Sequence, residues 1–309
     1  MKKSFILLFS ILFFAINVQA FAIEQCEEGV CKLEEAPTEQ EIQNNLKKEQ
    51  ITAFIKKFEK FQNKHDLLEL KRIYAEEFVN SDGFNRNQLF ALMKRTFLSY
   101  PDLKTDIKIN DIVVIDDYAM VFVEQKLSAT TQNVSQITGD KGIYVADLNS
   151  ILYLKKINDI WKIYSENVTF ENSRLAYGSA KEIIASINAP QKVLVDTDYC
   201  AGVDITLPAG FSAIASINNT QIVEDFNLAG ETFRQVPPDK GSLERVLRAN
   251  NKNNNEAVVA SIGFTQTGED MFKKPKVEIS GIIMLMKRVD VIPENSNLTC
   301  QKESKSDKK

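Results

Sequence analysis

The chain has 309 residues, of which 44% are apolar and 26% are charged, and its formal net charge is -4 at pH 7. This composition excludes a disordered chain, and the length is enough for two ordinary domains with a core each. The negative charge argues against nucleic acid or an anionic membrane surface as the main partner.

Residues 1–22 have the pattern of an export signal. Lys2 and Lys3 form a positive start, an apolar run extends from Phe5 to Ile16, and small residues around Ala20 offer a cleavage site. About a dozen apolar residues is short for a membrane-spanning helix, which needs roughly 20. An uncleaved anchor is the alternative. Cleavage would remove both lysines, change the net charge to -6 and leave the mature chain in the periplasm or secreted from a bacterium.

Four cysteines, Cys26, Cys31, Cys200 and Cys300, lie beyond this signal, and an even number in an exported chain favours disulfides. Three pairings are possible. Proximity favours Cys26 with Cys31, which leaves Cys200 with Cys300 to tie the tail to the second half. A loop near 100 residues closed in this way is worth up to about 4 to 5 kcal/mol in the chain-entropy model. A zinc site would need partners for His65, the only histidine, and none is near in sequence.

Helical patterns come after an acidic leader at 23–40. Apolar residues recur at three and four positions from Glu41 to Phe61 and again from Asp66 to Phe78. Asn87 can cap a third helix, which Pro101 ends. His65 then lies in a polar turn between the first two helices, where we expect it to be exposed.

Alternating apolar residues predict four long strands after the helices. Their ranges are Lys104–Ile115, Tyr118–Ala129, Gly142–Ile157 and Ile160–Phe170. Asp116-Asp117 and Asn158-Asp159 are candidates for tight turns between neighbouring strands.

This order of helices and long antiparallel strands, ending in ILYLKKINDIWKIYSENVTF with the single tryptophan Trp161, resembles the nuclear-transport-factor-2-like superfamily. The superfamily is also called SnoaL-like or cystatin-like, and the resemblance covers about residues 45–175. It implies an α+β fold in which N-terminal helices pack on a curved antiparallel sheet, the cone fold. Enzymes and non-enzymes both occur among its members, so the fold leaves the activity open.

The resulting domain organisation has this cone domain at 41–175, a connector at 176–190, and a mainly-β domain at 191–292. Short strands separated by Pro-Ala-Gly and Asn-Asn turns predict that the mainly-β domain is either an immunoglobulin-like sandwich or a barrel. Residues 293–309 form a polar tail.

One segment of the mainly-β domain has a helical pattern. Leu243–Ala249 reads as a short helix in which Glu244 and Arg248 form an ion pair four residues apart. Such a pair is expected to be structural only.

Enzymes of the resembled superfamily use an acidic or histidine base inside the cone, with a tyrosine that donates to a developing oxyanion. The resemblance makes Asp147 or Glu124 the candidate base and Tyr74 the candidate donor. Strand alternation alone does not distinguish the concave face from the convex one, and a solvated strand face is the alternative for these carboxylates.

A ligand pocket is expected from residues on the last two long strands of the cone. The candidate residues are Tyr153, Asn149, Trp161 and Tyr164. The alternative for the aromatic members is a place in the core or in a pocket wall.

The favoured function is that of a non-enzymatic exported envelope protein, a binding or assembly module for a small apolar ligand or an unidentified protein partner. One alternative is a polyketide-cyclase-like or isomerase-like enzyme, and another is a periplasmic component of a secretion machine. A third is that the mainly-β domain carries the function. No cofactor, metal or stable membrane insertion is expected once the signal is cleaved. The resemblance implies a homodimer through the open sheet face, since such dimers are common in the superfamily.

Overall fold

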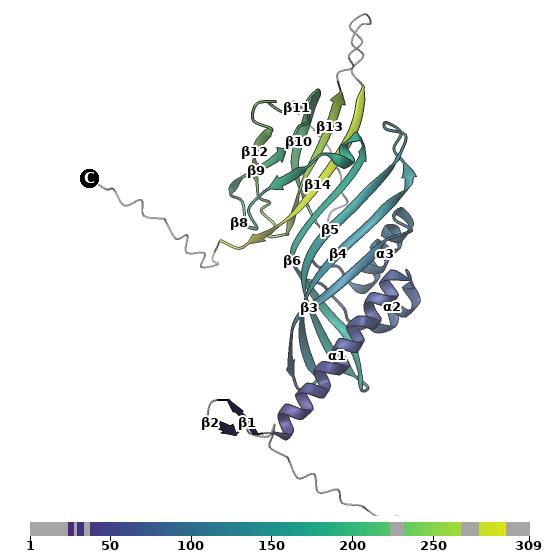
Figure 1. Cartoon of the computed structure of the whole chain (residues 1–309), viewed down its shortest axis with the longest axis vertical. Coiled ribbons are helices and arrows are strands. Elements are labelled where there is room, and N and C mark those ends of the chain that lie inside the picture. Colours follow the sequence, from purple (N-terminus) through teal and green to yellow (C-terminus); the bar gives the residue numbers. More distant parts are fainter. Residues whose placement is uncertain (1–23, 28–29, 34–37, 223–231, 267–277, 295–309) are drawn as a thin grey trace, which may run out of the picture. The chain divides into compact units, whose positions relative to one another are not determined.

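Figure 1 shows the computed structural model, which describes residues 24–27, 30–33, 38–222, 232–266 and 278–294. The predicted export signal and most of the predicted polar tail therefore lie outside the described residues. The chain divides into two compact units, Met1–Lys47 and Lys48–Lys309. Within the described ranges, every helix is too short or too polar to cross a membrane.

Three helices and fourteen strands make up the described part of the chain. The helices are α1 (Glu39–Asn63), α2 (Leu67–Ile73) and α3 (Arg86–Ser99), and a 3₁₀ turn, η1, covers Ser179–Glu182. The strands are β1 (Glu24–Glu27), β2 (Val30–Leu33), β3 (Lys104–Ile115), β4 (Tyr118–Val134), β5 (Lys141–Ile157), β6 (Ile160–Gly178), β7 (Ala185–Asn188), β8 (Lys192–Leu194), β9 (Asp198–Ile205), β10 (Phe211–Gln221), β11 (Arg234–Gln235), β12 (Ser242–Arg248), β13 (Glu256–Gln266) and β14 (Ile279–Ile292). The predicted α+β class is confirmed.

The larger unit is built on one nine-stranded sheet. Its strand order is β11-β10-β13-β14-β6-β5-β4-β3, and β8 pairs with β14 beside this path. Both predicted hairpin turns are confirmed, because Asp116, Asn158 and Asp159 adopt the positive φ angles of 52°, 49° and 63° that such turns require. These turns set the register of β3 with β4 and of β5 with β6.

Helices cover one face of the sheet over β3 to β6, as expected (Figure 1). Ile51, Ile55 and Phe58 of α1 are fully buried with Leu152 and Leu154 of β5 in one hydrophobic core. We call this the helix-side core. Its even-numbered β5 residues show which face of that strand points toward the helices.

Two helix boundaries differ from the predicted ones. α2 ends at Ile73 because Tyr74 is extended and bridges to Ile163 of β6, so the sheet takes over the backbone hydrogen bonds that a longer helix would use. α3 is capped by Asn85 instead of Asn87, since the Asn85 side chain and Gln88 form a capping box.

β6 carries the sheet across the predicted boundary at residue 175. It runs to Gly178, and its residues from Asn172 onward pair antiparallel with β14 from Lys287 back to Gly281. The connector expected at 176–190 accordingly contains the end of β6, the turn η1 and the strand β7. One sheet therefore joins the segments that the sequence assigns to two domains.

The second hydrophobic core lies on the opposite face of that sheet. Ala176 of β6, which belongs to it, is the register partner of odd-numbered Ile143 on β5, whereas the helix-side core uses even-numbered β5 residues. Directly opposed residues of antiparallel strands share a face, so the two cores are on different faces. Ala176 is also opposite Ile283 of β14.

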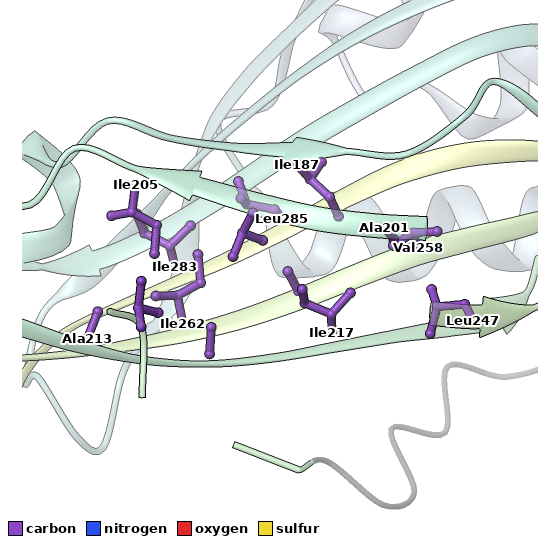
Figure 2. Close-up of a cluster of buried hydrophobic side chains, with 14 of the residues drawn as sticks. Ile187, Ala201, Ile205, Ala213, Ile217, Leu247, Val258, Ile262, Ile283 and Leu285 are labelled. Carbon is purple, nitrogen blue, oxygen red and sulfur yellow. The ribbon is translucent and has the colours of Figure 1, made fainter. Parts of the chain in front are cut away.

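A small three-stranded sheet of order β12-β9-β7 covers this second core, which we call the sandwich core. Figure 2 shows Ile187 and Ile205 of the small sheet lying over Ile283 and Leu285 of the large one. Two packed sheets of alternating residues give the sandwich-like arrangement expected for this half.

The helix predicted at Leu243–Ala249 is wrong, because this segment is strand β12. Each of its residues from Ser242 to Arg248 pairs with β9, and its alternating Leu243 and Leu247 pack against the sandwich core. Residues four apart in a strand are about 13 Å apart, too far for the predicted Glu244–Arg248 pair. Arg248 binds Asp196 instead, with 3.0 Å between Nε and Oδ1.

If the pairing of β6 with β14 couples the two cores, a substitution that destabilises the sandwich core also destabilises the helix-side core. Trp161 is the single tryptophan and is buried in the helix-side core, so its fluorescence reports on that half. We expect Ile283→Ala to lower the free energy of unfolding by about 2 to 4 kcal/mol, the usual cost of a large-to-small core change. Urea titrations followed by tryptophan fluorescence and by circular dichroism should shift together.

The matched control is Val246→Ala, which removes an exposed apolar side chain from β12 and should leave both titrations unchanged. A loss of circular dichroism without a shift of the tryptophan signal would instead show two halves that unfold independently.

The disulfide pairing stays a prediction with a direct test. Backbone register places Cys26 opposite Cys31 across the β1–β2 hairpin. Cys200 is exposed and has no disulfide partner among the described residues, and its predicted partner Cys300 lies outside them. We expect non-reducing peptide mapping of the purified protein to recover Cys26 linked to Cys31 and Cys200 linked to Cys300. Recovery of free thiols at Cys200 and Cys300 would contradict the second pair.

Candidate functional site

The predicted carboxylates lie on the helix-free face of the sheet. Asp147 and Asn149 are odd-numbered residues of β5 and are exposed, and Glu124 is opposite Asn149 on β4. Glu124 accepts hydrogen bonds from Asn110 Nδ2 at 2.9 Å and from Lys108 Nζ at 3.3 Å. These bonds lower the pKa of Glu124 from its usual value. The solvated-face alternative fits these three positions.

Tyr74, the predicted donor, is inside the helix-side core. Its ring meets Phe58, Phe78 and Phe90 edge to face, with centroid distances of 6.1, 5.0 and 5.5 Å. Burial raises the pKa of Tyr74 well above its usual value, and the charge of Glu166 raises it further. The carboxyl group near Tyr74 is therefore Glu166.

Glu166 is on β6 and is the register partner of buried Leu152, so it points toward the helices. Burial raises its pKa, and a hydrogen bond from the Ser150 side chain opposes that rise. Ser150 in turn receives a long contact of 3.5 Å from Gln125 Nε2. These contacts form a chain of polar side chains in which Ser150 and Gln125 are buried and Glu166 is half-buried.

Glu171 is a second inward-facing carboxyl group on β6. It pairs with Leu148, an even-numbered residue of β5, and so shares the face of Glu166. Burial raises the pKa of Glu171 to about 7; Arg288 opposes the rise, while Asp82 and Glu166 add to it. Glu171 can therefore exchange a proton close to neutral pH.

A buried ion pair lies beside these carboxyl groups. Arg288 of β14 donates to both oxygens of Asp82, with Nη1–Oδ2 at 2.9 Å and Nη2–Oδ1 at 2.6 Å. Its Nε donates to Asp290 Oδ1 at 2.8 Å. Asp82 also accepts from Asn255 Nδ2 at 2.8 Å. The side chains of Arg288 and Asp82 are only 3% and 4% exposed, so this pair is held away from bulk water.

Tyr144 is close to Glu171 on the same face. Burial raises the pKa of Tyr144, the charge of Glu171 raises it further, and the Ser173 side chain bonds to it. Tyr100, at the end of α3, lies against Tyr144 with 4.8 Å between the ring centroids. Both tyrosines are half-buried, so the part of this site around Glu171 has some contact with solvent.

The sequence misses Glu166 and Glu171 because two irregularities in β6 change its alternation. The register skips Tyr164 between Tyr153 and Leu154 of β5, and it skips Thr169 between Asn149 and Ser150. Each extra residue reverses the face to which the later side chains of the strand point. The inward residues Ile163, Glu166 and Glu171 are consequently three and five apart, spacings that no regular strand allows.

A separate cleft of about 430 Å³ opens on the helix-free face, near the turns of the two hairpins. We call it the tyrosine cleft. It is lined by Val113, Ile115, Tyr118, Ala119, Met120, Tyr153, Leu154, Tyr164 and Ser165. Val113, Met120, Tyr153 and Ser165 form one row across β3, β4, β5 and β6 in register.

Exposed aromatic and apolar groups rim this cleft. Ile115, Tyr118 and Tyr164 are 60%, 52% and 38% exposed. Lys155 Nζ lies 5.7 Å from the centre of the Tyr118 ring and 5.5 Å from that of Tyr164. A cation thus stands over two rings of an otherwise apolar site.

Two of the four predicted pocket residues meet in this cleft. Tyr153 and Tyr164 line it, whereas Asn149 is exposed elsewhere on β5. Trp161 is buried in the helix-side core, where its Nε1 has no hydrogen-bond partner among the described residues. The sequence alone places Tyr153 and Tyr164 on two strands. That they meet in one cleft depends on how four strands pair.

His65 has a structural place. It adopts a φ of 54° in the turn between α1 and α2, stacks on Phe97 with 4.2 Å between the ring centroids, and contacts the Leu103 carbonyl oxygen through Nε2 at 3.2 Å. It is half-buried instead of exposed, because α3 packs against the turn. Across the described ranges, no three His, Cys, Asp or Glu side chains gather as metal ligands would.

Comparisons with known proteins identify no family for this sequence, and no curated protein matches it. Several solved structures resemble part of the fold. A conserved protein from Planctomyces limnophilus DSM 3776 is 10% identical with a TM-score of 0.35 and matches 40% of this chain and 94% of its own length. The Kfla4162 protein from Kribbella flavida is 9% identical with a TM-score of 0.34, over 40% of this chain and 90% of its own.

The third structure is a protein from Novosphingobium aromaticivorans DSM 12444 that is provisionally named a scytalone dehydratase. It is 12% identical with a TM-score of 0.33, over 41% of this chain and 87% of its own. Likenesses at this level carry no argument about function, which has to come from the sites themselves.

The pKa of Glu171 predicts how stability changes with pH. The unfolded chain loses this proton as the pH rises through about 4.5, while the folded protein keeps it to about 7. The free energy of unfolding should therefore fall between those values and stay lower above pH 7. We expect Glu171→Gln to be more stable than wild type by about 1 to 3 kcal/mol at pH 8 and no more stable at pH 4.

Urea titrations at pH 4, 6 and 8 measure this effect, and exposed Asp147→Asn is the control that should match the wild type. The free energy of unfolding of Glu171→Gln should still fall somewhat with rising pH, because burial raises the pKa of Glu166 too. Parallel curves for Glu171→Gln and wild type at every pH would show that Glu171 ionises normally.

Proposed function

We propose that this protein is an exported, non-enzymatic binding module, and that the tyrosine cleft is its ligand site. The observation that carries the proposal is the cleft itself, an apolar hollow of about 430 Å³ rimmed by exposed tyrosine rings. Ligand sites in proteins are commonly about 300 to 1,000 Å³ in volume, mostly apolar, and equipped with few polar groups.

The lining supports a small apolar ligand that carries an acidic group. The rings of Tyr118, Tyr153 and Tyr164 offer flat apolar surfaces for the ligand body. Lys155 over two of these rings supplies the positive charge that an acidic group would pair with. Exposed apolar rings cost free energy in water, and a ligand would cover them.

The exported setting of this proposal rests on residues 1–22, which have the pattern of a cleaved signal. A second copy of the chain is another possible occupant of the cleft, since the cleft is on the helix-free face of the sheet. The ligand proposal commits to a small molecule and makes the second copy an outcome of the test.

The test is binding of dodecanoate to the purified full-length protein by isothermal titration calorimetry, with dodecanol as its uncharged counterpart. We expect Tyr164→Ala to weaken dodecanoate binding about tenfold, since a buried aromatic contact is worth more than about 1 kcal/mol. Lys155→Gln should weaken dodecanoate binding severalfold and leave dodecanol binding unchanged.

Controls come from residues outside the cleft. Ile184→Ala removes an apolar side chain that is more exposed than Tyr164, and Lys108→Gln removes an exposed lysine. Both should bind as the wild type does. Equal binding by Tyr164→Ala would rule out the cleft as the ligand site, and a dimer in light scattering that Tyr164→Ala abolishes would assign the cleft to a second copy.

A second candidate function is a polyketide-cyclase-like or isomerase-like enzyme. The observation in its favour is that Glu166, Glu171, Tyr74 and Tyr144 face one interior, with the pKa of Glu171 raised to about 7. Native mass spectrometry separates the two candidates if a small molecule co-purifies. Its loss from Tyr164→Ala supports the cleft, and its loss from Glu171→Gln with retention in Tyr164→Ala supports the interior.

A further inference from the structure

The segment 79–85, which connects α2 to α3, is fastened to the sheet at several points. Ser81 N donates to the Glu166 carbonyl oxygen at 2.9 Å, and Ser165 Oγ donates to the Val79 carbonyl oxygen at 2.6 Å. These bonds hold the segment against β6. Its one ionic attachment in the described part of the chain is Asp82, which binds Arg288 on β14, the strand that pairs with the next part of β6.

The group around Arg288 carries more acid than base. Asp82 and Asp290 already bind its guanidinium, and Glu166 and Glu171 lie close enough to interact with both Arg288 and Asp82. Four ionised carboxylates would surround one buried cation. Charges in a low-dielectric interior interact strongly, so this group is stable only while some of the carboxyl groups keep their protons.

We infer that the Asp82–Arg288 pair is a proton-dependent clamp, which holds segment 79–85 on the sheet while Glu166 and Glu171 are neutral and releases it when they ionise. Ionised Glu171 attracts Arg288 and repels Asp82, so it weakens the pair from both sides. The ion pair of the clamp and the tyrosine cleft use different side chains on opposite faces of the sheet, and Ser165 is the residue that contacts both the cleft and segment 79–85.

The titratable groups that face the clamp are acids and tyrosines around one cation. Segment 79–85 contributes Asp82, β14 contributes Arg288 and Asp290, and β6 contributes Glu166 and Glu171. The residue after α2, Tyr74, interacts with Glu166, and Tyr144 of β5 interacts with Glu171 and with Tyr100 at the end of α3. Burial keeps these tyrosines neutral, so the only cation among these groups is Arg288.

The Ser81 amide reports on the clamp, because its bond to β6 breaks when the segment leaves the sheet. Amide hydrogen exchange of the full-length protein, followed by NMR at pH 6 and pH 8, measures its protection after correction for intrinsic rates. We expect the protection of Ser81 in wild type to fall about tenfold from pH 6 to pH 8, the factor that one pKa unit of coupling gives. Amides in the centre of β13 should stay constant.

Variants distinguish release of segment 79–85 from a loss of stability throughout the protein. Glu171→Gln should keep the Ser81 protection of pH 6 at pH 8, Asp82→Asn should lose protection at both values, and exposed Asp147→Asn should behave as wild type. Glu166→Gln gives the same comparison if Glu171→Gln does not fold. A wild-type protection that is equal at both pH values, or a tenfold fall that survives in both glutamine variants, would overturn the proposal.

Discussion

The pairing of β6 with β14 is the interaction on which the rest of this structure depends. It lets one sheet continue from the strands under the helices into the strands of the sandwich, and it brings residues about a hundred positions apart into register. Because side chains alternate along every strand, the two halves can use opposite faces of that sheet for their cores. Helices cover one face and the small sheet covers the other. The same pairing carries Arg288 to the helix side, where Glu171 and Asp82 meet it.

Two extra residues in β6 decide which chemical groups face the interior. Without the irregularity at Tyr164, the alternation that buries Ile163 would turn Glu166 toward solvent, and the irregularity at Thr169 keeps Glu171 on the same face as Glu166. The first of them also turns Ser165 toward the tyrosine cleft, beside Tyr164. Bulges of this kind lengthen a strand by one residue and redirect its side chains. They are therefore as important to this protein as any single side chain.

The two sites divide the chemistry of the sheet. The helix-free face presents exposed rings and one lysine, an arrangement suited to binding from solvent. The helix side holds carboxyl groups whose charge is costly and is balanced by Arg288, and it also holds Tyr74, enclosed by phenylalanine rings. Burying ionisable groups in this way sacrifices stability at neutral pH, and such groups are concentrated at functional sites in proteins. We therefore propose that the interior responds to pH while the outer face binds a ligand.

By itself, the amino-acid sequence determined the helices, the four long strands and both hairpin turns, because these depend on local periodicity and on residues such as Asn158 and Asp159 that tolerate positive φ. It also indicated a mainly-β second half, with a sandwich and a barrel both open, and the tertiary structure decided for two packed sheets. Only the tertiary structure decided that Leu243–Ala249 is a strand, since its register with β9 outweighs its local helical pattern. It alone decided that Asp147 and Glu124 face outward while Glu166 and Glu171 face inward. A face is assigned by strand pairing and bulges, and neither is encoded in the spacing of one strand.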